Sequence, residues 1–237
     1  MSLLVFEHHP AEGPAVLGSI LNSGYGRCLN HVKLYAGDPV PTKLDGVNGI
    51  VSMGGPMNVD QVDPHPWIEK EMRYLKVAHE AGVPVVGVCL GAQLIAAALG
   101  GIVASMAQPE IGWHAVDLAF GGTVDPVFAG QGWQGVQFHL HGQEVAKLPP
   151  GGVALAASQH CRNQAFRVGL TTYGFQYHFE WNRQDLAEMV RDPFVVRCGH
   201  LPEQILGQSD RYYEDYRRLG DRLCHMIAMT LLPMGKR

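Results

Sequence analysis

The chain has 237 residues, of which 46% are hydrophobic and 17% charged, the composition of an ordinary soluble globular protein with a sizeable core. The formal net charge is −4 and no basic run occurs, so nucleic acid is not expected as the main partner. No apolar run approaches the length of a membrane span, and the N-terminus lacks a basic region followed by a long apolar one. We therefore expect no membrane association and no secretory signal.

The cysteine and histidine patterns argue against disulfides and metal sites. The five cysteines are an odd number and no two have the Cys-x-x-Cys spacing, which favours a reducing, cytoplasmic compartment over a disulfide framework or a structural zinc site. The histidine pairs His8-His9 and His139-x-His141 lack a carboxylate or cysteine companion at metal-ligand spacing. We expect neither a metal nor a cofactor.

The first hundred residues alternate between apolar strands and amphipathic helices. In chain order they predict a strand (residues 2–6), a helix (12–23), two strands (31–35 and 49–53), a helix (67–81), a strand (83–88) and a helix (90–99). Such alternation predicts an α/β fold with a mainly parallel central sheet and helices on both faces. Ligands of such sheets bind at the carboxyl ends of the strands, so the Gly54-Gly55 turn and Cys89 are expected to be neighbours.

From residue 102 the pattern changes to short strands separated by turns with glycine or proline. The predicted strands are 113–120, 136–139, 153–157, 165–168 and 172–178, and the predicted helices are 184–191, 202–206 and 210–231. The strands predict an antiparallel meander added to the parallel sheet. With no internal repeat or linker, the simplest interpretation is one domain, residues 1–237, with extra C-terminal helices at about 184–231. The last helix is expected to dock on the domain's own core, with a dimer or partner contact as the alternative.

The segment Gly87-x-Cys89-x-Gly91 has the pattern of a nucleophile elbow with cysteine in place of serine. It lies between a short β-branched run and an Ala- and Leu-rich helix, and the flanking glycines allow the chain segments to pass closely. A thiolate at a helix N-terminus is favoured electrostatically, and the amide of Leu90 can donate to an oxyanion. The alternative is a buried structural cysteine.

A thiolate nucleophile needs an acid/base and a group that orients it. The best candidates are His178 and Glu180, because residues two apart on an extended strand face the same way and Glu180 could fix the tautomer of the His178 ring. A solvated or structural pair is the alternative. The second oxyanion donor is expected from Gly54-Gly55-Pro56, which could also be an ordinary turn at a strand end.

The chain resembles the class I glutamine amidotransferases, specifically stand-alone proteins similar to the glutaminase domain of GMP synthase. The resemblance rests on residues 54–57 (GGPM), 87–93 (GVCLGAQ), 110–114 (EIGWH), 141–142 (HG), 161–167 (CRNQAFR) and 174–180 (GFQYHFE). It implies a flavodoxin-like three-layer sandwich and a triad of Cys89, His178 and Glu180 that hydrolyses a glutamine side-chain amide. It further implies an oxyanion hole of Gly55 and Leu90. The substrate-binding residues that it implies are Gly54, Gln93, His141, Gly142 and Gln143.

The chain departs from the family pattern at two points. The family usually has Trp-His-Gly-Asp where this chain has Leu140-His141-Gly142-Gln143, and a proline where this chain has Phe179. An aspartate could pair with an α-ammonium group, whereas Gln143 offers only hydrogen bonds. We therefore expect that free glutamine is not the preferred substrate.

The identity of the reaction partner is open at this stage. The expected partner is a small γ-glutamyl compound. An amidotransferase must deliver ammonia to an acceptor, and the chain has no room for a synthetase domain after the glutaminase-like one. A separate synthetase subunit could supply the acceptor site, or the protein could be a γ-glutamyl hydrolase or peptidase. A non-catalytic binding or regulatory role and a homo-oligomer also stay open.

Overall fold

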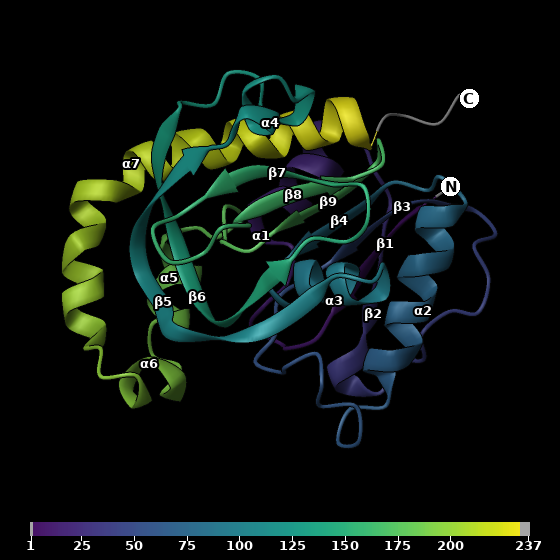
Figure 1. Cartoon of the computed structure of the whole chain (residues 1–237), viewed down its shortest axis with the longest axis horizontal. Coiled ribbons are helices and arrows are strands. Elements are labelled where there is room, and N and C mark those ends of the chain that lie inside the picture. Colours follow the sequence, from purple (N-terminus) through teal and green to yellow (C-terminus); the bar gives the residue numbers. More distant parts are fainter. Residues whose placement is uncertain (1, 233–237) are drawn as a thin grey trace.

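The computed structural model describes residues 2–232 (Figure 1). The strands are β1 (Ser2–Glu7), β2 (Leu29–Lys33), β3 (Val47–Ser52), β4 (Val85–Val88), β5 (Ile102–Leu118), β6 (Gln134–Lys147), β7 (Gly152–Ala157), β8 (Ala165–Val168) and β9 (Thr172–Phe175). The α-helices are α1 (Ala15–Ser19), α2 (Trp67–Glu80), α3 (Leu90–Ala98), α4 (Phe120–Thr123), α5 (Arg183–Met189), α6 (Pro193–Arg197) and α7 (Pro202–Met226). Short 3-10 or π turns lie at Ile20–Gly24, Leu34–Ala36, Pro126–Phe128 and Ile227–Leu231.

The described strands form one nine-stranded sheet in the order β2-β1-β3-β4-β9-β8-β7-β5-β6. Pairing is parallel from β2 to β9 and antiparallel from β9 to β6. The sheet is therefore mixed, and the expectation of a mainly parallel sheet was wrong. The meander does not lie on a separate layer, because β8 pairs directly with β9 and continues the same sheet.

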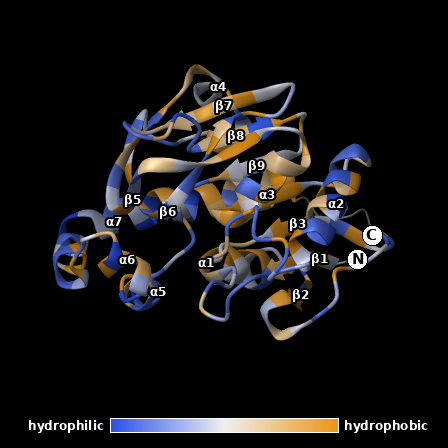
Figure 2. Cartoon of the chain, turned by 60° about the horizontal axis from the view of Figure 1, so that its bottom comes forward, coloured by the Kyte–Doolittle hydropathy of each residue, from blue (hydrophilic) through white to orange (hydrophobic). Residues whose placement is uncertain are grey.

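Helices cover both faces of the parallel half. One hydrophobic cluster joins the sheet to α1 and α7, and a second joins it to α2 and α3. Figure 2 shows many hydrophobic residues in the strands and in helix α3 in the middle of the molecule. The parallel strand order, followed from β2 through β1, β3 and β4 to β9, is that of a flavodoxin-like sheet. The fold is thus α/β and flavodoxin-like, as the resemblance implied.

The second half of the chain departs most from the predicted elements. The strands predicted at residues 113–120 and 136–139 are parts of β5 and β6, which form a long two-stranded ribbon toward α5 and α6 (Figure 1). The helices predicted separately at 202–206 and from 210 are one helix, α7, which begins at Pro202. Helix α6 was not predicted. A third hydrophobic cluster, with Trp181 and Tyr216 at its centre, packs α5, α6 and α7 on the ribbon.

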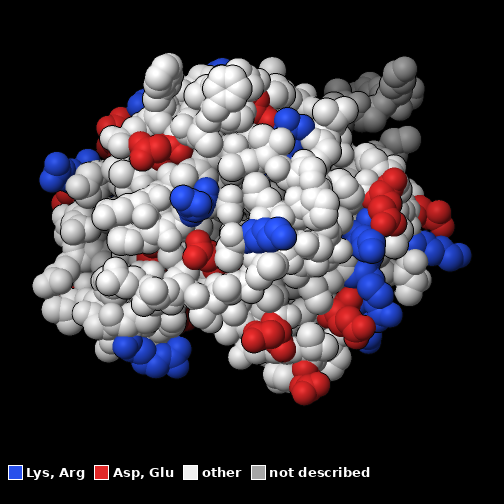
Figure 3. Space-filling model, in the orientation of Figure 1, with Lys and Arg blue, Asp and Glu red and all other residues white. Residues whose placement is uncertain are grey.

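The surface and the helices give two further findings. On the face shown in Figure 3, basic and acidic side chains are interspersed, and no continuous basic surface covers the described residues there. No helix within residues 2–232 is both long enough and apolar enough to cross a membrane.

Candidate active site

Cys89 occupies the sharp turn between β4 and α3, with φ 52° and ψ −108°. This left-handed conformation is costly for a side chain larger than glycine and is typical of functional turns. The flanking glycines are needed for close approach: a Cβ at Gly87 would lie 2.5 Å from the backbone of Gly91, and a Cβ at Gly91 would lie 2.6 Å from the carbonyl carbon of Ser52. The predicted elbow geometry is therefore present, with β3, β4 and α3 packed backbone to backbone.

His178 and Glu180 form a buried pair beyond the end of β9. Nδ1 of His178 donates to Oε1 of Glu180 at 2.7 Å, and the other carboxylate oxygen accepts from the amide of Phe179 at 2.9 Å. Strand β9 ends at Phe175 rather than at residue 178, and His178 is instead held by an isolated bridge to Phe138. The predicted contact between His178 and Glu180 is therefore present, but the backbone between them is bent and does not belong to a strand.

The ring of His178 is held on its face by Trp181, with ring centroids 3.5 Å apart and planes 11° apart. The carbonyl of Trp181 accepts hydrogen bonds from Tyr216 and Arg217 of α7, each at 3.0 Å. Helix α7 therefore fixes the residue on which the imidazole stacks. This support was not predicted, because it joins segments far apart in the sequence.

Burial by itself lowers the pKa of His178, but the charge of Glu180 and hydrogen bonding with Cys89 and Glu180 raise it to about 10. The Cys89 thiol therefore contributes to the charge state of the ring, although no hydrogen bond of ordinary geometry joins Sγ to Nε2 in the described residues. Sγ donates to the carbonyl of Leu140 at 3.9 Å, and Nε2 has no hydrogen-bond partner within the described chain. The free ring nitrogen is accordingly available for proton transfer.

The turn after β3 lies against both Leu90 and His178. A Cβ at Gly55 would lie 3.0 Å from a methyl carbon of Leu90, and one at Gly54 would lie 3.0 Å from Cε1 of His178. His8 anchors this turn, because its Nδ1 lies 3.0 Å from the carbonyl oxygen of Met53 and 3.1 Å from that of Gly54.

His8 is oriented from its other side. Its Nε2 lies 2.8 Å from Glu71, and both side chains are fully buried. Burial lowers the pKa of His8, but the charge of Glu71 and their hydrogen bond outweigh it and raise the pKa above its usual value. Sequence patterns did not single out this pair, since its members are 63 positions apart.

A cavity opens over the thiol of Cys89. The predicted site residues that line it are Gly55, Cys89, Gln93, His141, Gly142 and Gln143. Gly54, Leu90, His178 and Glu180 are not among the residues that line it. The opposite wall comes from α5 and α6 and the turn between them, through Met189, Asp192, Phe194 and Arg197. Helix α6 was not predicted, so this wall was unforeseen.

The residues predicted to bind substrate are also bound to one another. Nε2 of Gln93 donates to the backbone carbonyl of Gln143 at 3.1 Å and to Oε1 of Gln176 at 3.2 Å. Nδ1 of His141 donates to the same carbonyl at 3.0 Å, and its Nε2 lies 3.1 Å from Glu110. Both ring nitrogens of His141 are thus engaged within the protein. The buried Oε1 of Gln143 has no partner in the described chain.

Glu12 is a cavity residue that sequence reasoning missed. Its side chain is 6% exposed and makes no hydrogen bond or ion pair with the described residues. Burial and the negative charge of Glu180 raise the pKa of Glu12, the positive charge of His178 opposes this, and the result is about 7. A carboxyl group left without a partner in a cavity that Cys89 also lines is more typical of a functional site than of a core.

One expectation about metal ligands was wrong. His139 and His141 do have a carboxylate companion, Glu110, which lies opposite His141 in the register of β5 and β6. Glu110 lies 29 residues before His139 in the sequence, so no short motif contains both residues. Burial would raise the pKa of Glu110, but hydrogen bonds from the two histidines lower it well below its usual value.

Comparisons with known proteins place the chain in a family. Residues 25–196 match the family model described as glutamine amidotransferase class-I. The chain is 29% identical to the putative glutamine amidotransferase-like protein YfeJ of Salmonella typhimurium, over 70% of each chain. It is 33% identical to a glutamine-hydrolysing GMP synthase subunit of Haloquadratum walsbyi, over 65% of this chain and 78% of that one. It is also 34% identical to the GMP synthase of Leifsonia xyli, of which it spans only 30%.

Solved structures show the same fold. A glutamine amidotransferase from Methylobacillus flagellatus superposes with a TM-score of 0.85 and 25% identity, covering 99% of this chain and 97% of that one. A second glutamine amidotransferase, from Thermotoga maritima, gives a TM-score of 0.84 at 21% identity, with 97% and 99% coverage. Because the family model matches well over half of the residues, the chain belongs to the class I glutamine amidotransferase family.

Proposed function

We propose that the protein hydrolyses a γ-glutamyl amide by acyl transfer through Cys89, His178 and Glu180. The thiolate of Cys89 attacks the γ-carbonyl carbon. His178 protonates the leaving amine as the C–N bond breaks, and a thioester forms. His178 then takes a proton from water, which attacks the thioester and releases the γ-carboxylate and the free thiol. The observation that carries this proposal is the buried His178–Glu180 pair at 2.7 Å beside a strained cysteine elbow.

The oxyanion of the tetrahedral intermediate is assigned to the amides of Gly55 and Leu90. Leu90 is the first residue of α3, so its amide has no partner within the helix and the helix dipole adds to its effect. Gly55 lies against Leu90 on the turn that His8 anchors. Loss of one such donor typically costs about a hundredfold to a thousandfold in rate.

The glutamyl part of the substrate is assigned to Gly54, Gln93, His141, Gly142 and Gln143. Because the ring nitrogens of His141 are engaged elsewhere, the groups of the 141–143 segment assigned to contact substrate are the Gly142 backbone and Oε1 of Gln143. A neutral amide gives an α-ammonium group hydrogen bonds but no charge, so free glutamine is not the preferred substrate on this proposal.

A second candidate is a γ-glutamyl peptidase or hydrolase that transfers no ammonia. The observation in its favour is the wall formed by Met189, Asp192, Phe194 and Arg197, which faces Cys89 and could contact a leaving group larger than ammonia. In favour of ammonia transfer are the relatives named as single subunits of GMP synthase, which suggest that this chain also works with a separate synthetase. The five free cysteines fit a cytoplasmic location for either activity.

The test is a screen of γ-glutamyl amides, free glutamine included, with the wild-type protein and two cysteine variants. We expect Cys89→Ala to abolish turnover and Cys161→Ala to retain it, because burial raises the pKa of Cys161 and keeps that thiol unreactive. A glutamine-like chloroketone should label Cys89 but not the exposed Cys28. Turnover by Cys89→Ala would eliminate the triad, and absence of both turnover and labelling in the wild type would favour a non-catalytic role.

The substrate screen also separates the two enzymatic candidates. Release of amines from γ-glutamyl conjugates at rates well above that for glutamine identifies a hydrolase or peptidase. A glutaminase rate that rises when a nucleotide-dependent synthetase is added identifies an amidotransferase. Size-exclusion chromatography of the same protein decides whether it forms a homo-oligomer.

A further inference from the structure

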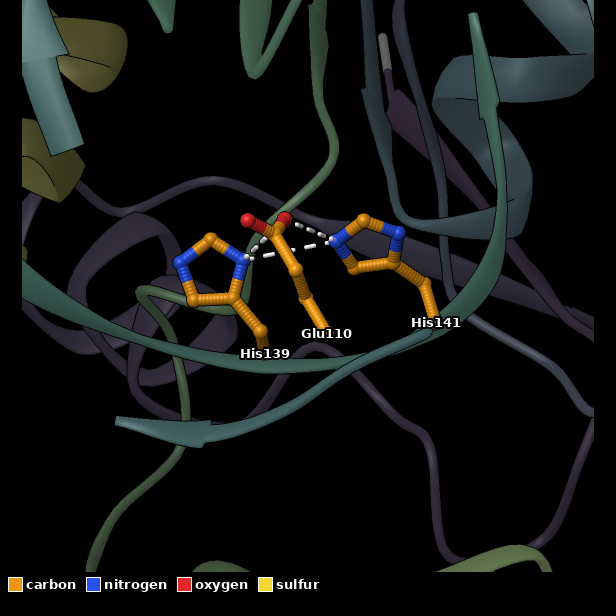
Figure 4. A group of neighbouring side chains, drawn as sticks. All are labelled: Glu110, His139 and His141. Carbon is orange, nitrogen blue, oxygen red and sulfur yellow. Dashed lines mark hydrogen bonds and ion pairs between the residues drawn. The ribbon is translucent and has the colours of Figure 1, made fainter. Parts of the chain in front are cut away.

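Glu110, His139 and His141, the last of which lines the cavity, bring three potential ligand atoms together (Figure 4). Oε2 of Glu110 lies 3.1 Å from Nε2 of His141 and 3.5 Å from Nδ1 of His139, and the two nitrogens are 3.4 Å apart. All three side chains are buried, with residue exposures of 0%, 0% and 3%. They come from neighbouring strands, Glu110 from β5 and the histidines from β6.

This cluster needs a positive charge. A buried carboxylate is costly unless a cation compensates it, and no lysine or arginine among the described residues forms an ion pair with Glu110. Nδ1 of His141 carries a proton, because it donates to the carbonyl of Gln143. The carboxylate can then be balanced in one of two ways. A second proton on Nε2 makes the ring an imidazolium that donates to Oε2, or a neutral ring presents its Nε2 lone pair and a metal cation lies between the two atoms.

The spacing of the three atoms suits a tetrahedral metal ion. Ligands of a tetrahedral ion with bonds of about 2.0–2.1 Å lie about 3.3–3.4 Å apart. The observed separations of 3.1, 3.4 and 3.5 Å bracket that value. An octahedral ion with the same bond length would draw its ligands to about 2.9 Å. Two imidazoles and one carboxylate are also a donor set that zinc prefers.

We propose that Glu110, His139 and His141 bind a zinc ion that holds β6 in place at the cavity. The fourth position of the tetrahedron falls to a small exogenous ligand such as water, since the described residues supply three ligands. The ion takes no part in acyl transfer. It fixes the segment that ends in Gly142 and Gln143, which line the cavity, and the proposal therefore stands independently of the triad.

The surrounding groups suit this role. Ligating carboxylates are usually held by hydrogen bonds of their own. Ser158 donates to Oε1 of Glu110 at 2.5 Å, and the side-chain amide of Gln164 donates to Oε2. The Gln143 carbonyl fixes His141 in the tautomer that leaves Nε2 free for a metal. The ring of His139 packs perpendicular to that of His114, with centroids 5.3 Å apart.

The test is metal analysis of the purified full chain, before and after chelation and incubation with zinc alone. We expect about one zinc per chain to survive gel filtration of the wild type, as for a three-ligand protein site. Glu110→Gln and His139→Ala should fall to background, whereas the matched control His160→Ala, an exposed histidine, should keep its zinc. Cys89→Ser should keep its zinc as well, which separates this proposal from the proposed triad.

Two further readouts keep the proposal falsifiable if the ligand variants fold poorly. Zinc added to the chelated wild type should raise its Tm, because the ion binds the folded state. Cobalt in place of zinc should give the intense visible absorption of tetrahedral geometry. A wild type that binds no zinc either as purified or after incubation, or ligand variants that bind it as well as wild type does, would show that protons alone join the three side chains.

Discussion

The closest backbone packing in the candidate site predicts the effect of Gly91→Ala. The added Cβ would overlap the backbone carbonyl oxygen of Ser52 and lie 2.6 Å from its carbonyl carbon, and neither backbone can move as a flexible side chain would. Overpacking of this kind costs up to about 3 kcal/mol, and the better helix propensity of alanine returns about 1 kcal/mol. The net loss of about 2 kcal/mol corresponds to a fall in Tm of roughly 4–8 °C for a chain of this size.

Gly207→Ala is the matched control. Gly207 lies within α7, and a Cβ there would meet nothing within 4 Å. This substitution should stabilise the protein by up to about 1 kcal/mol. Thermal and urea unfolding followed by circular dichroism measures both variants. If Gly91→Ala unfolds at or above the wild-type Tm, the close packing of α3 on β3 does not constrain the elbow, and the physical reason given for its glycines is wrong.

Two predictions concern the buried ionisable groups. The pKa of Glu12 is raised to about 7, because the folded protein favours the protonated carboxyl group. The stability linked to this proton is complete below about pH 4.5 and is lost as pH rises through 7. Glu12→Gln should therefore be more stable than wild type at pH 8, by on the order of 2 kcal/mol, with the difference shrinking toward pH 4.5 in urea titrations; an equal difference at both pH values would contradict the assignment. Burial lowers the pKa of His178, but the charge of Glu180 outweighs it, and the pKa is raised to about 10. Stability linked to protonated His178 is complete below about pH 6.5 and is lost as pH rises through 10. Glu180→Gln should therefore reduce the fall of the free energy of unfolding with rising pH in this range. The same substitution should lower turnover by roughly a thousandfold or more. An unchanged slope would mean that Glu180 does not set the charge of the ring.

Local signals in the sequence were sufficient for the parallel half of the fold and for choosing the residues of the proposed triad. The apolar runs predicted at residues 49–53 and 83–88 correspond to β3 and β4, because buried parallel strands are nearly continuous in hydrophobicity. The spacing of glycines around Cys89 reflects backbone contacts that leave no room for a Cβ. His178 and Glu180 are two residues apart, so their contact is visible in one short segment.

The sequence was least informative where long-range contacts decide the structure. Strand β5 has no regular alternation of buried and exposed residues, and β6 alternates only in its second half, so only parts of each strand were predicted. In α7, the polar stretch around Gly207 interrupted the helical pattern, but packing of Tyr216 and Leu219 keeps the helix continuous. Glu12 and Glu110 reach the site from distant segments, and no short-range spacing marks them.

The pairing of β4 with β9 has a consequence for how the chain folds. Gly87 lies opposite Gly174 in this pairing, so the two central strands of the sheet meet only after the whole ribbon and meander between them has been synthesised. Closing so long a loop is slow, since its entropy cost precedes the contacts that offset it. A nascent chain that ends before β9 therefore contains Cys89 without His178. The thiol and the imidazole of the proposed triad can therefore meet only after the segment that follows β9 has been synthesised.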